Sequence, residues 1–270
     1  MTDNSNTTAP QPLSIWQKLN EWVNAVANPG QFLKYSSVIL PWLGGLAVLG
    51  LITGLYWAFF ITPVEEEMGK TVLIMFVHVP AAWISQMCYV LIAASSFGLL
   101  VWRHPLADVS AKAAAPIGAI ITFLCLVTGS LWGRPDWGTY WQWDLRMTSV
   151  LVLFFLYIGL ITLRNAIDEE VQAGKVTAIL ALVGVVLLPV IKWSVEWQQS
   201  ALHQKAGIIR GEVSVDYLIP LLIMALSYTA LFFYLHMKAM RAEIYRRRTV
   251  AQQRRLAYNA LKDEQQPNSE

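Results

Sequence analysis

The chain has 270 residues, of which 56% are hydrophobic and only 14% are charged. A water-soluble domain of this length could not bury so much apolar surface in one core, so the composition excludes that class and indicates a protein lying mostly in lipid. The formal net charge is only +2 and the cations gather near the C-terminal end, which argues against nucleic-acid binding.

Residues 1–36 precede the first apolar run. Apolar side chains repeat at helical spacing from Trp16 to Val26, which predicts a helix lying on the membrane surface. Residues 37–237 then hold six predominantly apolar runs, each near or above the roughly 17 residues that cross a bilayer as a helix. The runs cover residues 37–61, 72–102, 113–132, 147–164, 177–193 and 216–237. The sequence therefore predicts an all-α membrane protein, a bundle of six transmembrane helices.

The distribution of cations orients this bundle, because Lys and Arg accumulate on the cytoplasmic side of membrane proteins. Six crossings put both termini on one side. If that side is the cytoplasm, 14 of the 20 Lys and Arg residues lie inside. Many of them lie in residues 238–270, a basic cytoplasmic tail that we expect to continue as a helix and to contact anionic membrane lipid or a cytoplasmic partner.

The second span is longer than a bilayer requires. From Thr71 to Trp102 it would form about 48 Å of helix, whereas the hydrocarbon core is about 30 Å thick. Its outer end therefore projects toward the outer aqueous layer. Counted back from Trp102, His78 lies near this outer interface, and Pro80 favours a kink beside it.

The connection between the third and fourth spans, residues 132–146, is rich in tryptophan. Four tryptophans fall within twelve residues, punctuated by two glycines and a proline. An aromatic belt at the membrane interface explains isolated tryptophans but explains this dense cluster poorly. A helical turn or two over residues 137–144 would bring four side chains to one face, namely Trp137, Tyr140, Trp141 and Asp144. Such a platform suits a large planar amphipathic ligand, and heme is such a molecule.

Heme iron needs axial ligands, and histidine is the usual one. Of the four histidines, His104 and His236 lie on the inner side of the predicted topology, whereas His78 and His203 lie on the outer side with the tryptophans. A lone histidine is more often a hydrogen-bonding residue of the interface. Two of them on the side of the aromatic cluster favour a pair of axial ligands.

Two polar residues at the start of the fourth span each have two interpretations. Asp144 can cap the helix, contribute to a heme site, or do both. Arg146 can pair with a heme propionate through charge-assisted hydrogen bonds, or it can reach toward lipid phosphate.

The stretch WGRPDWGTYWQWD, residues 132–144, resembles the tryptophan-rich (WWD) signature WGxxWGxxWxWD of heme-handling membrane proteins in cytochrome c maturation. All four signature tryptophans, both glycines and the aspartate are present. A short chain with six spans and one such segment is similar to the cytochrome c maturation protein C (CcmC) family. The resemblance covers roughly residues 35–240.

The resemblance implies that heme b is held at the periplasmic face of a bacterial inner membrane, between this segment and two flanking histidines. The implied ligands of the heme iron are His78 and His203, and the other implied heme-binding residues are Trp132, Trp137, Tyr140, Trp141, Trp143, Asp144 and Arg146. The resemblance also implies delivery of heme to a periplasmic chaperone (CcmE-like), in concert with ABC transporter subunits (CcmA-like and CcmB-like) and a small single-span subunit (CcmD-like). The chain would then assist covalent heme attachment to its chaperone, as a delivery protein more than a stand-alone enzyme.

Two other classes of function stay open. A bis-histidine electron-transfer subunit of the membrane would place facing histidines inside its spans, and the histidines here lie at span ends or in loops. A heme-translocating permease subunit would place polar or ionisable residues at mid-membrane. The middles of the first, fourth and sixth predicted spans are instead almost purely apolar.

Overall fold

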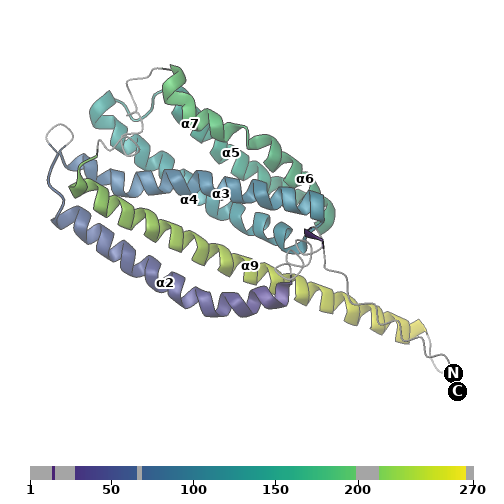
Figure 1. The fold of residues 1–270 in the computed structure, drawn as a ribbon. Helices are drawn as coiled ribbons and strands as arrows, with labels where there is room; N and C mark the ends of the chain where they lie inside the picture. Colours follow the sequence, from purple (N-terminus) through teal and green to yellow (C-terminus); the bar gives the residue numbers. More distant parts are fainter. Residues whose placement is uncertain (1–13, 16–27, 66–68, 199–212, 266–270) are drawn as a thin grey trace, which may run out of the picture.

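The computed structural model describes residues 14–15, 28–65, 69–198 and 213–265, and in these residues the chain is a bundle of long helices (Figure 1). The elements are α2 (Pro29–Phe60), the 3-10 helix η1 (Lys70–Ile74), α3 (Met75–Trp102), α4 (Pro105–Trp137), α5 (Leu145–Ala166), α6 (Glu170–Gly184), α7 (Leu187–Gln198) and α9 (Val215–Gln265). Six helical segments are long and apolar enough to cross a membrane. The predicted all-α bundle of six spans is therefore confirmed. The surface helix expected between Trp16 and Val26 lies outside the described residues.

Polar caps explain why two helices start earlier than their apolar runs. Asn28 accepts a hydrogen bond from the Gly30 amide at 2.8 Å at the start of α2. His104 caps α4 in the same way, accepting from the Ala107 amide at 3.3 Å. In both helices a proline follows the cap, at a position where its missing N–H costs no helical hydrogen bond. The runs predicted at residues 37–61 and 113–132 are thus parts of longer helices.

The fifth span is a broken helix, formed by α6 and α7 together. Pro189 follows the break and has no N–H to donate to the carbonyl of Val185 four residues earlier. The Leu188 amide donates to that carbonyl instead, at 3.1 Å, which tightens the turn. The run predicted at residues 177–193 is thus interrupted because Pro189, within it, lacks a backbone N–H.

Small residues decide how closely the helices approach. A Cβ added at Gly50 would lie 2.1 Å from Ser227 Oγ, and one at Gly54 would lie 2.6 Å from Met224 Sδ. The glycines of this GxxxG pair therefore face α9 of the same chain. In the centre of the bundle, the buried Tyr157 hydroxyl donates to the Ser85 carbonyl at 2.6 Å and ties α5 to α3.

The bundle has two distinct ends (Figure 1). At the loop end, α4 ends at Trp137, α5 begins at Leu145 and α7 ends at Gln198. At the tail end, α3 passes into α4, α5 passes into α6, and α9 continues well past the other helices. With 51 residues, α9 extends about 76 Å at 1.5 Å per residue, so the helical tail expected after residue 238 is confirmed.

Candidate functional site at the loop end

His78 lies in the first turns of α3 and faces α4. Its Nδ1 is 3.1 Å from the Cys125 carbonyl oxygen and 3.1 Å from Thr128 Oγ1. A carbonyl can only accept, and the Thr128 hydroxyl already donates to the Leu124 carbonyl at 2.7 Å. Nδ1 therefore carries the proton, and the lone pair of the imidazole is on Nε2. A histidine that ligates a metal is commonly held by this kind of backbone hydrogen bond from its other nitrogen.

Gly129 lets α4 approach the His78 ring. A Cβ at this position would lie 2.8 Å from His78 Cε1, closer than real Cβ contacts. One turn further along α4, the Trp132 ring meets the imidazole edge-on, with centroids 5.7 Å apart and planes at 69°. The half-buried His78 is thus held against one face of α4 by hydrogen bonds and by contact with an indole ring.

The tryptophan-rich segment is organised differently from the predicted helical platform. Gly138 adopts a left-handed conformation with φ of 71° and ends α4, and its amide donates to the Arg134 carbonyl at 3.0 Å. Residues 138–144 are not helical, so the common face expected for residues 137–144 is wrong. Trp137 belongs to α4 instead, and its ring lies against Gly133, where an added Cβ would be 2.4 Å away.

Two indole N–H groups in this segment are buried without a hydrogen-bond partner in the described part of the chain, those of Trp132 and Trp141. The Trp141 ring also meets Trp143 edge-on at 5.5 Å, and Trp143 itself is 76% exposed. Buried N–H donors are normally satisfied, because an unmade bond costs about 1–3 kcal/mol. The segment therefore combines an exposed aromatic surface with two buried donors that no described residue satisfies.

Asp144 and Arg146 both have structural partners. The buried Asp144 carboxylate accepts from the Met147 amide at 2.7 Å, so its predicted capping role is confirmed. Arg146 donates through Nε to Ser194 Oγ of α7 at 3.3 Å. The contact joins the start of α5 to the helix that leads toward His203. Nearby, the Arg134 guanidinium lies over the Tyr140 ring at 4.8 Å.

An apolar groove of about 360 Å³ runs between α4 and α5 below the tryptophan-rich segment, and Trp141 lines it at the loop end. The other lining residues are Phe123, Leu126, Val127, Ser130, Leu131, Leu151 and Phe154. The groove brings an apolar surface from the membrane-spanning helices up to the Trp141 indole.

The two other histidines in the described part of the chain lie toward the tail end. His104 is the N-cap of α4 at the tail end. His236 is buried in α9, where its Nε2 lies 3.2 Å from Ser110 Oγ and its ring stacks on Phe232. His203 lies outside the described residues, but the helix before it, α7, ends at the loop end (Figure 1).

Comparison with known proteins gives one consistent family. Residues 22–255 match the family model described as Heme exporter protein C. The chain belongs to the heme exporter protein C family. Proteins named Heme exporter protein C include one from Bradyrhizobium diazoefficiens, 54% identical over 83% of this chain and 85% of the relative. Another from Rhodobacter capsulatus is 38% identical over 90% and 98%, and one from Escherichia coli (strain K12) is 43% identical over 75% and 80%.

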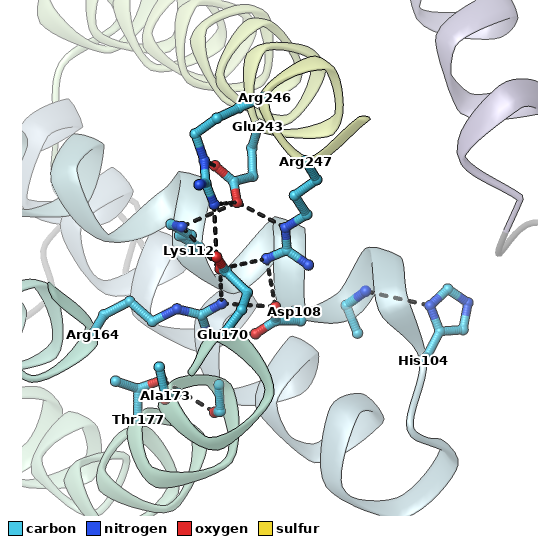
Figure 2. A network of polar contacts seen from close by, with 12 residues as sticks. His104, Asp108, Lys112, Arg164, Glu170, Ala173, Thr177, Glu243, Arg246 and Arg247 are labelled. Carbon is cyan, nitrogen blue, oxygen red and sulfur yellow. Dashed lines mark hydrogen bonds and ion pairs between the residues drawn. The ribbon is translucent and has the colours of Figure 1, made fainter. Parts of the chain in front are cut away.

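This member of the heme exporter protein C family also carries a polar cluster that the sequence patterns do not reveal. Seven charged side chains from four helices meet at the tail end (Figure 2), namely Asp108, Lys112, Arg164, Glu170, Glu243, Arg246 and Arg247. The buried Arg164 donates to both carboxylate oxygens of Asp108, at 2.5 and 2.8 Å. From the sequence alone these cations indicate only topology, since their partners are distant in the chain.

Proposed function

We propose that this chain is a heme-handling membrane protein of cytochrome c maturation, which binds heme b at the loop end and passes it on. The observation that carries the proposal is the hydrogen bonding of His78, whose Nδ1 lies 3.1 Å from both the Cys125 carbonyl oxygen and Thr128 Oγ1 of α4, so that Nε2 would carry the lone pair of the neutral ring. A neutral imidazole in this tautomer is ready to ligate iron. The names of its relatives, each called Heme exporter protein C, support heme as the ligand.

The surroundings of His78 fit a porphyrin. The Trp132 ring lies beside the imidazole and offers an aromatic surface to the macrocycle. The unpartnered N–H groups of Trp132 and Trp141 could donate to propionate oxygens at the polar edge. Tyr140 and Trp143, both strongly exposed, would complete the aromatic surface. These contacts bind both the apolar body and the polar edge of heme.

His203 is the proposed second ligand of the iron. The last residue of α7 is Gln198, only a few residues before His203, and α7 ends at the loop end. Arg146 is held against α7 through Ser194, which supports a position for it near the same ligand. Ligation by two histidines satisfies the iron while the porphyrin edge stays reachable, which suits transfer better than oxygen chemistry.

The proposed setting is a bacterial inner membrane with the loop end in the periplasm. The excess of Lys and Arg on the side of the tail supports this orientation. From there heme would pass to a periplasmic chaperone of the CcmE type, with CcmA-like, CcmB-like and CcmD-like subunits as partners. Family membership supports these partners, and covalent attachment would occur on the chaperone.

The ligands can be tested with purified protein and heme. We expect His78→Ala and His203→Ala each to abolish the low-spin heme spectrum. His104→Asn is the matched control, because it replaces a histidine at the opposite end and retains an N-cap. Heme retained with an unchanged spectrum in both alanine variants would exclude the assignment.

Delivery can be tested separately from binding. Co-expression with a periplasmic heme chaperone should yield covalent heme on the chaperone, detected by heme staining after denaturing electrophoresis. The same stain should fail with His78→Ala. Covalent heme formed at the normal level with that variant would contradict a delivery role even if heme binding is confirmed.

A further inference from the structure

A second cavity lies at the tail end, far from the tryptophan-rich segment. It measures about 550 Å³, within the range of about 300–1,000 Å³ that is typical of ligand pockets. Its walls are mostly aliphatic and come from five helices, with Ile92, Leu99, Ala115, Ile117, Leu160 and Ile161 among them. Part of the ionic cluster forms its polar side, through Asp108, Lys112, Arg164, Glu243 and Arg246. The cavity is therefore amphipathic.

The ionic cluster has an excess of positive charge. Its seven ion-paired side chains comprise four cations and three anions. The anions are already shared, since Lys112 Nζ contacts both Glu170 and Glu243 at 3.0 Å. Arg246 has the most exposed side chain of the four cations, at 46%. One further negative charge placed beside Arg246 would neutralise the cluster.

Two more features mark this cavity as a binding site. Ser96 lines it, and its hydroxyl is buried without a partner in the described part of the chain, in a residue only 1% exposed. Ala242 also lines it and is exposed, one helical turn before Arg246 on α9. Residues four apart share one face of a helix, so a small residue and the exposed cation stand together at the opening.

The lining excludes heme as the natural occupant. Among the described lining residues there is no histidine, cysteine, methionine or tyrosine, so the iron would have no axial ligand. There is also no tryptophan or phenylalanine on which a porphyrin could stack. Aliphatic walls next to a cationic opening suit a flexible hydrocarbon chain that carries an anionic head group.

We infer that this cavity is a binding site for one anionic phospholipid of the leaflet on the tail side. The phosphate group contacts Arg246 at the opening, and part of one acyl chain fills the aliphatic interior. The bound lipid supplies the negative charge that the cluster lacks, and it links α4, α5 and α6 to α9. The site is independent of heme, since its charged lining lies at the tail end, whereas His78 lies in the first turn of α3 at the loop end of the bundle (Figure 1).

The test is native mass spectrometry of the full chain in detergent, with phosphatidylglycerol and phosphatidylethanolamine of identical acyl chains. The single negative charge of phosphatidylglycerol should give about fivefold tighter binding, because one basic residue near a membrane surface contributes about 1 kcal/mol. Arg246→Gln should abolish this preference, and Arg246→Lys should keep it. Ala242→Phe, which fills the opening, should remove the tightly held lipid.

Matched controls lie further along the same helix. Arg248→Gln and Ala251→Phe alter exposed residues of α9 that do not line the cavity, and both should bind lipid normally. Equal binding of the two lipids, or an unchanged preference in Arg246→Gln, would overturn the inference. Displacement of phosphatidylglycerol by an equal concentration of inorganic phosphate would also overturn it, since the acyl chain would then contribute nothing. Displacement by stoichiometric heme would assign the cavity to heme instead.

Discussion

Replacing Gly129 by alanine should displace the proposed heme ligand His78 without changing the chemistry of its imidazole. The new Cβ would lie 2.8 Å from His78 Cε1, whereas ordinary contacts lie at 3.4–4 Å. The imidazole must then move by at least about 0.6 Å, a displacement large enough to impair a preorganised site. Movement away from α4 stretches the Nδ1 contact to the Cys125 carbonyl, now 3.1 Å, beyond the usual N–H···O range of about 2.7–3.2 Å.

The expected result is a loss of heme affinity of about tenfold or more, the lower range for losing a partner that orients a metal ligand. The assay is a heme titration of purified protein, followed by absorbance in the Soret region. Gly159→Ala is the control, because its Cβ would lie 3.9 Å from Leu180 and needs no rearrangement. Wild-type heme affinity and spectrum in Gly129→Ala would refute the argument that α4 positions His78.

Three further outcomes are expected. Asp108→Asn removes the bidentate partner of the buried Arg164 and should lower the free energy of unfolding by about 3 kcal/mol, seen as a lower thermal midpoint. Asp168→Asn, at an exposed residue, should leave the midpoint unchanged, and equal midpoints of the two variants would contradict the pairing. Gly50→Leu should detach α2 from α9 and destabilise the fold, whereas Gly45→Leu should be neutral because nothing lies within 4 Å of its Cβ position; equal thermal midpoints would show that the close approach is unimportant. Heme affinity should fall as pH drops below about 6.5, because a protonated histidine cannot ligate iron; an unchanged heme spectrum from pH 8 to 5 would count against histidine ligation.

The separation of the two ends has a consequence for experiments on this protein. Heme binding is proposed at the loop end, and the ionic cluster and its cavity lie at the tail end. Substitutions in the cluster should therefore change stability or lipid binding and leave the heme spectrum intact. Substitutions around His78 should change the heme spectrum and leave lipid binding intact.

Much of the architecture could be predicted from the sequence because its causes are local. Apolar runs of sufficient length must cross the membrane as helices, since no other structure satisfies the backbone of a single span. The cap at Asp144 was visible for the same reason, as it acts on amides only a few residues away. The tryptophan-rich segment and its resemblance to a known signature were equally visible, because they depend on consecutive residues.

The conformation of that segment could not be predicted from spacing. Helical periodicity placed Trp137 and Tyr140 on one face, but Gly138 takes the left-handed conformation and ends α4 between them. Spacing along a helix carries information only while the helix continues. A glycine at the end of a long helix, followed by further aromatic residues, was the signal against a continuous platform.

The sequence by itself determined the six spans, the cap at Asp144 and the clustering of tryptophan, since each depends on the chemistry of neighbouring residues. Only the tertiary structure decided which side chains of different helices face one another. It brought the Cys125 carbonyl to His78 across 47 residues, and Arg247 to Asp108 across 139. Such contacts depend on the rotation and register of packed helices, which the pattern of a single span does not specify.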